Sequence, residues 1–285
     1  MTAVSAVVTA LAERLQRAGV PSPVADAELL VCHVTGWTRG EVSAKAFMGA
    51  ELDDEVLARL EPLAARRESR EPLQHITGEA PFRTLLLAVG PGVLVPRPET
   101  ELVAEWAIDA LRQVPTATPR AIDLGTGTGA LALALATEVP QAQVWAVERS
   151  AAAADWAERN IARYGDHRVT LVRGDAATAA PELDGTIDVV VTNPPYIPDA
   201  EMPADVEVHG FDPAEALFGG TDGLRDVRGF IARAATLLRP GGTLVLEHGD
   251  GQGAAVRDIA TAAGFRMTAT HTDLLHRERA LTAVR

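Results

Sequence analysis

The stretch "RAIDLGTGTGA", residues 120–130, decides the fold because a short apolar strand runs directly into a glycine-rich turn. Gly125, Gly127 and Gly129 let the backbone turn sharply and approach a ligand closely. A predicted helix over 130–138 begins directly after them, and the free N–H groups at its start favour a nucleotide-like ligand. The stretch therefore predicts a strand, a cofactor loop and a helix, the opening unit of an α/β domain.

Strand-like and helix-like segments continue to alternate after this loop. Strands are predicted over 120–125, 142–148, 168–175, 186–193, 242–249, 265–273 and 279–285, and helices over 130–138, 151–164, 226–238 and 251–263. Apolar strands that alternate with helices predict a mostly parallel sheet with helices on both faces. The last two strands are separated by too few residues for a crossover helix, so we expect the sheet to end in an antiparallel strand.

The chain before this domain has a different texture. Residues 1–78 carry apolar stripes at helical spacing, which predict a small helical bundle with no strands and with helices ending near Gly19–Pro21 and covering 23–35 and 53–67. Residues 79–96 are extended and broken by glycine and proline, which predicts a β-hairpin linker to a second domain over 97–285. Three arginines of this bundle form its one basic cluster, which suits either a solvated helix end or an anionic contact: Arg66, Arg67 and Arg70.

Composition and charge exclude several classes of protein. The 285 residues are 47% hydrophobic and 23% charged, which is typical of a folded globular chain. A formal net charge of −13 disfavours direct nucleic-acid binding, and the one lysine, Lys45, is not part of a phosphate-binding P-loop. No apolar run is long enough to predict a membrane span. With Cys32 as the single cysteine and no metal-ligand spacing, we expect a protein of the reducing cytoplasm that holds no metal.

The glycine loop alone leaves the class of cofactor open. Its Gly125-x-Gly127-x-x-Ala130 spacing also satisfies the loose fingerprint of NAD-dependent enzymes. Glu148, at the end of the second strand, is placed to accept hydrogen bonds from ribose hydroxyls in either class. A nicotinamide-dependent oxidoreductase and a noncatalytic binding module therefore remain alternatives at this point.

The tetrapeptide "NPPY", Asn193 to Tyr196, follows the fourth strand and points to methylation of a planar nitrogen. The lone pair of such a nitrogen is delocalised, so it is a poor nucleophile. The Asn193 side-chain carbonyl and the Pro194 backbone carbonyl can each accept one N–H, which aims the lone pair and stabilises the growing positive charge. Pro195 stiffens the turn, and Tyr196 supplies a flat wall for the planar group. Hydride transfer needs none of these features, and methyl transfer needs no metal.

With these residues, the chain resembles the class I S-adenosylmethionine-dependent methyltransferases. More narrowly, it is similar to the glutamine N5-methyltransferases that modify peptide chain release factors, from about Pro72 to the C-terminus. The segments that carry this resemblance are "QHITGEAPF" (74–82), "VLVPRPETE" (93–101), "NPPYIP" (193–198) and "FDPAEALFGGTDGL" (211–224). The resemblance implies a Rossmann-like, seven-stranded methyltransferase domain that uses S-adenosylmethionine and releases S-adenosylhomocysteine.

The resemblance also implies roles for individual residues. Cofactor-binding roles fall on Asp123, Gly125, Thr126, Gly127, Thr128, Gly129, Glu148, Asp175, Ala176 and Asn193. Catalytic roles fall on Asn193, Pro194 and Tyr196, and Pro195 completes the glutamine pocket with these three. The small Ala176 departs from the pattern, because a bulkier residue often packs on the adenine there. Residues 96–101 are expected to fold over the site, and 211–224 to form a substrate-side flap.

The implied reaction methylates the glutamine of the Gly-Gly-Gln loop in class 1 release factors. We expect the helical bundle to dock this protein substrate, and we expect a monomer that contacts neither nucleic acid nor membrane. Two other methyl acceptors remain alternatives, a ribosomal-protein glutamine and the adenine N6 of DNA, although the negative net charge disfavours DNA. His248, in "LEHG", is more typical of a structural histidine than of a catalytic one.

Overall fold

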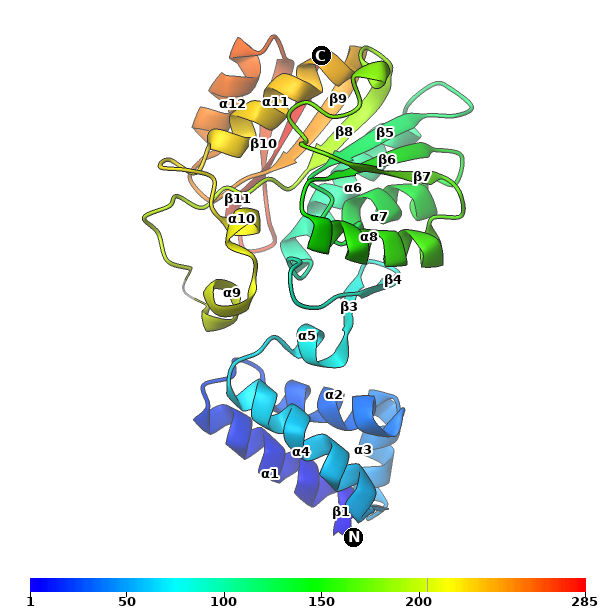
Figure 1. The fold of residues 1–285 in the computed structure, drawn as a ribbon, viewed down its shortest axis with the longest axis vertical. Coiled ribbons are helices and arrows are strands. Elements are labelled where there is room, and N and C mark those ends of the chain that lie inside the picture. Colours follow the sequence, from blue (N-terminus) through cyan, green and yellow to red (C-terminus); the bar gives the residue numbers. More distant parts are fainter. Residues whose placement is uncertain (204) are drawn as a thin grey trace. The chain divides into compact units, whose positions relative to one another are not determined.

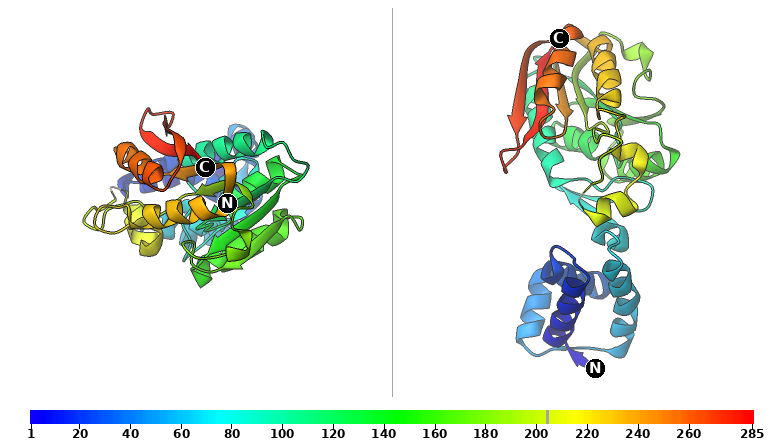
Figure 2. Two further views of the ribbon diagram at one scale, coloured as in Figure 1. Left: turned by 90° about the horizontal axis from the view of Figure 1, so that it is seen from above. Right: turned by 90° about the vertical axis from the view of Figure 1, so that its left-hand side faces the viewer.

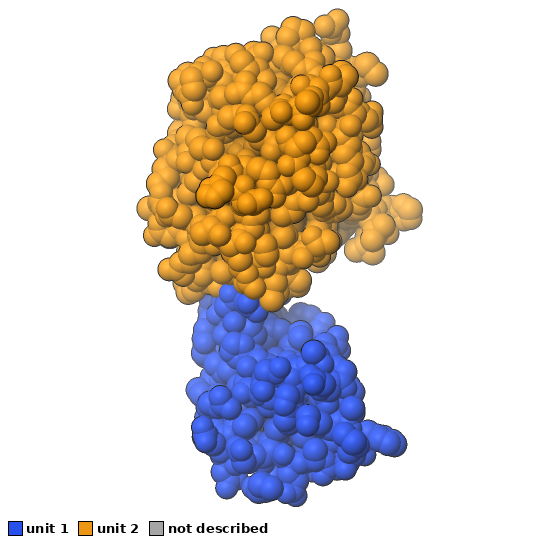
Figure 3. All heavy atoms as spheres, turned by 90° about the vertical axis from the view of Figure 1, so that its right-hand side faces the viewer, with its two compact units in different colours: residues 1–79, 203–211 blue, residues 80–202, 212–285 orange. Residues whose placement is uncertain are grey.

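The computed structural model describes residues 1–203 and 205–285, which form two compact units. Unit 1 comprises residues 1–79 and 203–211, and unit 2 comprises 80–202 and 212–285 (Figure 3). Along the described residues, no helix is both long and apolar enough to cross a membrane.

Unit 2 is built on a seven-stranded sheet with the order β10-β11-β9-β8-β5-β6-β7 (Figure 1). Its strands are β5 (Arg120–Leu124), β6 (Gln143–Glu148), β7 (Val169–Arg173), β8 (Ile187–Thr192), β9 (Leu238–Glu247), β10 (Arg266–Thr272) and β11 (Glu278–Val284). The pairs from β7 to β9 are parallel, whereas β11 is antiparallel to both β9 and β10. The predicted fold class, with its antiparallel C-terminal strand, is confirmed.

Helices cover both faces of this sheet (Figures 1 and 2). The helices of unit 2 are α6 (Pro98–Arg112), α7 (Ala130–Glu138), α8 (Ala151–Tyr164), α10 (Ala214–Leu217), α11 (Arg225–Leu237) and α12 (Gly253–Ala262), with a 3₁₀ turn at Pro181–Leu183. The helices α6 and α7 share one apolar core with the sheet, and α11 and α12 share the other. Because α7 is packed between the sheet and α6, its residues are apolar on all sides, and Ala130 to Ala136 are all buried.

The long helix α6 has no counterpart among the predicted elements. Its first turn is "PETE", part of the segment 96–101 that we expected to fold over the site without assigning it a secondary structure. Pro98 is the first residue of the helix, where the backbone N–H that proline lacks would have no partner within the helix. This helix fixes Thr100 against the body of unit 2, because Thr100, Val103 and Ala104 are all buried.

The strands β3 (Glu79–Phe82) and β4 (Leu85–Ala88) form the expected two-stranded hairpin. Its apolar residues Phe82, Leu85 and Leu87 are buried in the core that α6 and α7 share with the sheet. Asn160 of α8 secures β4, because its side chain accepts from the Ala88 N–H and donates to the Ala88 carbonyl. The hairpin is therefore packed as part of unit 2.

Unit 1 contains a helical bundle closed by one short pair of strands. Its helices are α1 (Val4–Arg17), α2 (Pro23–Thr35), α3 (Arg39–Phe47), α4 (Asp54–Glu68), α5 (Leu73–Thr77) and α9 (Val206–Phe211). Local signals explain several of their ends: Gly36 adopts a left-handed conformation after α2, and Asp53 caps α4. The expectation of no strands was wrong, because β1 (Thr2–Ala3) and β2 (Glu51–Leu52) pair antiparallel. Two-residue strands are too short to leave an alternating pattern in the sequence.

The arginine cluster of unit 1 is used internally. Arg67 is buried and donates to both Asp26 and Glu207, and Arg70 donates to both oxygens of Glu207. Burial alone would raise the pKa of Glu207, but the bonds from Arg70 and Arg67 outweigh it and lower that pKa to about 2. These ion pairs explain why 203–211 belongs to unit 1, although the predicted boundaries place it in the second domain.

Candidate active site

An open cavity of about 970 Å³ lies in unit 2 around the loops that follow β5, β6, β7 and β8. Ligands gather at this carboxyl edge in open α/β sheets. The predicted residues that line the cavity are Gly125, Thr126, Gly127, Thr128, Glu148, Asp175, Ala176, Asn193 and Pro195. The structure thus brings residues from four separate loops to one site.

The glycine loop is shaped by its own backbone. The N–H groups of Gly125 and Thr126 both donate to the Val147 carbonyl, at 3.0 and 2.8 Å. All three glycines have positive φ, which is costly for other residues. A Cβ on Gly127 would meet only Val93, at 3.9 Å, so the loop leaves open space on the cavity side.

Asp123 lies under this loop and does not itself line the cavity. Its Oδ2 accepts from the Thr126 hydroxyl at 2.5 Å and from the Ala132 N–H at 3.2 Å. Its Oδ1 has no hydrogen-bond partner within the described part of the chain. Complete burial raises the pKa of Asp123 to about 7. A cationic or donor group beside the loop would therefore find an acceptor that the protein leaves unpaired.

Glu148 connects the second strand to the glycine loop. Its Oε2 accepts from the Gly127 N–H at 2.9 Å, and its Oε1 accepts from the Ser150 N–H at 2.8 Å. Each carboxylate oxygen keeps a further lone pair for a ligand donor. The expected position of Glu148 in the cavity is therefore compatible with a bound diol.

The cavity wall at Asp175 and Ala176 contains an aromatic residue that was not among the predicted site residues. Ala176 is buried and Asp175 is exposed, and both line the cavity together with Phe230 of α11. The ring of Phe230 lies next to the glycine loop, because a Cβ on Gly125 would meet it at 3.4 Å. Phe230 forms part of an apolar helix face in the sequence, which gives no sign of a ligand contact.

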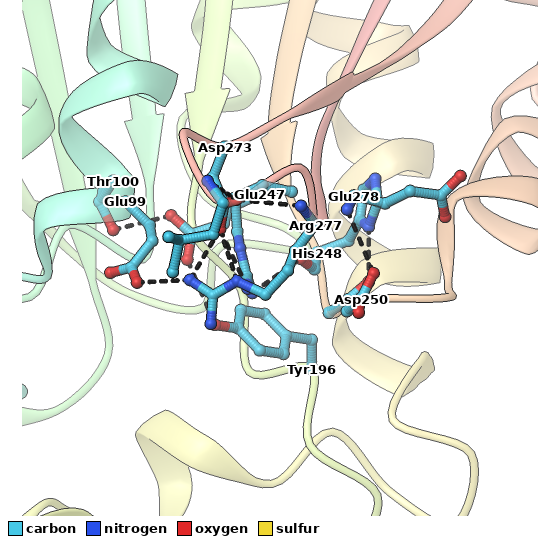
Figure 4. A network of polar contacts seen from close by, with 12 residues as sticks. Glu99, Thr100, Tyr196, Glu247, His248, Asp250, Asp273, Arg277 and Glu278 are labelled. Carbon is cyan, nitrogen blue, oxygen red and sulfur yellow. Dashed lines mark hydrogen bonds and ion pairs between the residues drawn. The ribbon is translucent and has the colours of Figure 1, made fainter.

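The NPPY turn brings its two polar side chains toward the same buried carboxylate. The Asn193 amide Nδ2 donates to the Thr100 hydroxyl at 3.3 Å, and that hydroxyl donates to Glu247 Oε2 at 2.7 Å. The Tyr196 hydroxyl donates to the other oxygen, Glu247 Oε1, at 3.3 Å (Figure 4). Pro194 is buried and does not line the cavity, and neither does Tyr196.

Glu247 stands at the end of β9 and is only 1% exposed. Burial raises its pKa to about 7, against the bond from Thr100 and the charge of Arg279, which lower it. Burial and the Glu247 carboxylate also raise the pKa of Tyr196, so its hydroxyl stays protonated at neutral pH. Neither Thr100 nor Glu247 was among the predicted site residues, although both lie within noted segments, "PRPETE" and "LEHG".

The two segments expected to flank the substrate are pinned to each other. Arg97 forms an ion pair with Asp212, whose side chain is fully buried. Burial raises the pKa of Asp212, and the Arg97 guanidinium opposes that shift. Arg97, Pro213, Glu215 and Ala216 all line the cavity. Pro213, Glu215 and Ala216 of the expected flap therefore form part of the cavity wall.

His248 directly follows strand β9. It is fully buried, its Nδ1 bonds the Gly249 carbonyl at 2.8 Å, and it does not line the cavity. Burial lowers its pKa, so the ring is neutral near pH 7.

Comparison with known proteins gives this site its family. A Streptomyces coelicolor release factor glutamine methyltransferase is 50% identical over 273 residues, which cover 95% of this chain and 94% of that protein. The chain belongs to the release factor glutamine methyltransferase family. A Mycolicibacterium smegmatis release factor glutamine methyltransferase is 46% identical over 290 residues, covering 100% of this chain and 99% of its own. The resemblance inferred from the motifs is confirmed.

Models of two domain families also match this methyltransferase. Residues 6–78 match the PrmC N-terminal domain, and residues 107–216 match the methyltransferase small domain. Among solved structures, the hMettl16 catalytic domain aligns with a TM-score of 0.54 and 15% identity, over 81% of this chain and 82% of that one. At that identity the likeness shows the fold alone. Membership of a glutamine methyltransferase family removes the nicotinamide-dependent oxidoreductase from the alternatives.

Proposed function

We propose that this enzyme transfers the methyl group of S-adenosylmethionine to the side-chain amide nitrogen of the glutamine in the Gly-Gly-Gln loop of class 1 release factors. One observation carries the proposal: Asn193 of the NPPY turn opens into the same cavity as the glycine loop and Glu148. A methyl donor and an amide acceptor can therefore meet within one pocket. The family membership supports the choice of a release factor as substrate.

The residues of the cavity fit S-adenosylmethionine. The open space beside Gly127 accommodates a ligand backbone, Glu148 retains lone pairs for ribose hydroxyls, and Phe230 offers an aromatic face near Ala176. Asp123 does not line the cavity, but its unpaired Oδ1 is an acceptor directly under the glycine loop, which suits a positively charged amino group of the methionine portion bound above that loop. When bound, the cofactor supplies an electrophilic methyl group on a sulfonium, which no side chain can provide.

The chain's own residues bind and orient the amide. Asn193, which lines the cavity, accepts an N–H bond of the glutamine through its Oδ1, which orients the amide nitrogen and stabilises positive charge on it, whereas the buried Pro194 does not line the cavity. Pro195 lines the pocket, and Tyr196 buttresses the turn from behind through Glu247 and through Gln252, which donates to its carbonyl at 3.0 Å. The role of Tyr196 is thus to hold the wall of the pocket rather than to exchange protons.

We propose that the release factor docks on unit 1. We also propose that the enzyme is a monomer and acts in the cytoplasm. Beside the cofactor, the cavity admits only one side chain of the release factor, so recognition of a whole factor needs further contacts. A variant lacking residues 1–78 tests this role. We expect kcat/KM for the intact factor to fall at least about tenfold, a loss of about 1.4 kcal/mol in binding, with little change for a short Gly-Gly-Gln peptide. Equal efficiency on the intact factor, from a variant with native circular dichroism, would refute docking by unit 1.

Mass spectrometry of the products tests the reaction itself. A class 1 release factor is incubated with the enzyme and S-adenosylmethionine, beside a factor with its Gly-Gly-Gln glutamine replaced by alanine, a ribosomal-protein fraction and DNA. We expect one added methyl group on the Gly-Gly-Gln peptide and none on the alanine factor. Methyl transfer only to a ribosomal protein or to DNA would agree with methylation of a planar nitrogen at the NPPY turn but would overturn the choice of substrate.

A further inference from the structure

The NPPY turn is joined to two residues that are distant in the sequence. Asn193 Nδ2 lies 3.3 Å from Thr100 Oγ1 of α6, and Thr100 Oγ1 lies 2.7 Å from Glu247 Oε2 of β9. Thr100 is 5% exposed and Glu247 is 1% exposed, so water does not compete for these bonds. In Figure 4, the Thr100 side chain points from helix α6 toward the Glu247 carboxylate, and Tyr196 approaches the same carboxylate from a different direction.

The direction of each hydrogen bond in this series follows from the number of protons available. An ionised carboxylate only accepts, so the single hydroxyl proton of Thr100 is directed at Glu247. The Thr100 oxygen is then left as an acceptor, and the Asn193 amide must turn its NH₂ toward it. The opposite amide orientation would set Asn193 Oδ1 against the Thr100 oxygen with no proton between them. That arrangement would leave a polar atom in a buried site without its bond.

We propose that Glu247 acts through Thr100 as a positioning residue that fixes the orientation of the Asn193 amide and thereby selects an amide rather than a carboxylate as the methyl acceptor. This inference rests on the function proposed above. With NH₂ bonded to Thr100, Asn193 keeps its Oδ1 for the substrate. A glutamine NH₂ can donate to that oxygen, whereas a glutamate carboxylate has no proton to donate and is repelled.

The charged groups around Glu247 allow its carboxylate to be protonated as the pH falls, and protonation changes the hydrogen bonds that orient the Asn193 amide. Arg279 of β11 favours its ionised form and Glu99 of α6 opposes it, while Thr100 and Tyr196 donate to its two oxygens. The charge of Glu99 is offset by Arg277, which donates to it at 2.8 Å. Since burial raises the pKa of Glu247 to about 7, a lower pH protonates it. A protonated Glu247 can donate to the Thr100 hydroxyl. That hydroxyl is then free to donate to Asn193, so the Asn193 amide is no longer forced to turn its NH₂ toward Thr100.

A matched pair of variants at Thr100 tests the proposal. Thr100→Val removes the hydroxyl at nearly constant shape, and Thr100→Ser retains it. Because a bond to a charged group is lost, we expect the kcat of Thr100→Val to fall about tenfold or more, while Thr100→Ser stays within about threefold of the parent. Binding of S-adenosylhomocysteine, measured by calorimetry, should be similar in all three proteins.

The decisive readout is discrimination between amide and carboxylate. A release factor with the Gly-Gly-Gln glutamine replaced by glutamate serves as a competitive inhibitor. In Thr100→Val the Asn193 amide is free to turn, so the ratio of that inhibitor's Ki to the KM of the glutamine factor should fall about tenfold. A general loss of structure would weaken both ligands and leave the ratio unchanged. An unchanged ratio with normal kcat would overturn the proposal.

Glu247→Gln supplies an independent pH test. The parent's kcat should fall as the pH is lowered through about 7, and the variant, which cannot titrate there, should lack this inflection. The same inflection in Glu247→Gln would contradict the role of Glu247, and if this variant does not fold the Thr100 pair decides alone. A parent enzyme with no activity on the glutamine factor refutes the proposed function, whereas an active parent with an unaffected Thr100→Val refutes only this inference.

Discussion

The glycine loop and the NPPY turn face one cavity, yet they are held in place in different ways. The loop is held by Val147 through backbone bonds and by Asp123, which lies three residues before Thr126. The turn depends on side chains from far along the chain, because Thr100 is 93 residues from Asn193 and Glu247 is 51 residues from Tyr196. The proposed cofactor half of the site is therefore held by its own backbone and by residues of the two neighbouring strands, β5 and β6, and the proposed substrate half by side chains that are farther away in the sequence.

The largest effect that separates the two halves is expected from Asn193→Ala. Loss of the side-chain acceptor should lower kcat by about a hundredfold or more, as removal of one preorganised partner of developing charge does in other enzymes. Cofactor affinity should fall much less than kcat, because the glycine loop and Glu148 are untouched, although the family resemblance also gives Asn193 a contact with the cofactor. Methyl transfer to the release factor and calorimetric binding of S-adenosylhomocysteine measure the two quantities. A parallel loss of cofactor affinity would contradict this division of the site.

A smaller effect, of the opposite kind, is expected from Gly127→Ala. The methyl group enters the cofactor side of the cavity at a residue with φ of +57°, so cofactor affinity should fall about tenfold while kcat at saturation changes little. Gly185→Ala is the matched control, because Gly185 has a similar φ of +68° with open space around it and does not line the cavity. Both variants should lose about 1 kcal/mol of stability from strain. Equal cofactor affinity in the two variants would count against the loop as the cofactor cradle.

The smallest effect concerns the support under the loop. Burial raises the pKa of Asp123 to about 7, well above its unfolded value of 3.8. The native state therefore binds a proton that the unfolded state lacks, so this contribution to stability is present at low pH and is lost as the pH rises through about 7. Urea unfolding of the ligand-free protein between pH 5 and 8 should show this decline, at about 1.4 kcal/mol per pH unit below pH 7, and Asp123→Asn should lack it. Identical pH slopes for parent and variant would show that Asp123 does not titrate in this range.

Local signals predicted much of the molecule. The helices α2, α7 and α8 have the bounds expected from their apolar stripes and flanking residues, and the seven strands lie within the predicted segments or overlap them. The helix α6 was missed because "PRPETE" has prolines at its first and third positions. Such a pattern is typical of a loop when the packing of the following residues is unknown. The strands β1 and β2 exist only because the chain brings two dipeptides together.

The site shows the same limit. Nine of the predicted residues line the cavity, since each lies at or after the C-terminal end of a strand and parallel strands bring those ends to one edge. Phe230, Thr100 and Glu247 were not predicted, because an apolar helix residue, a threonine in a first turn and a glutamate at a strand end each have common structural roles. Only their contacts distinguish them.

By itself, the sequence determined the alternation of strands and helices, the glycine loop, the NPPY turn and the expectation of a planar nitrogen as methyl acceptor. These features are encoded by residues that are neighbours in the chain, and short-range backbone geometry follows from them. The tertiary structure alone decided that Glu247 and Thr100 meet Asn193, that Arg97 meets Asp212, and that Glu207 joins unit 1. Such contacts join distant residues inside a buried environment, where the free energy of each hydrogen bond depends on neighbours that the linear order does not show.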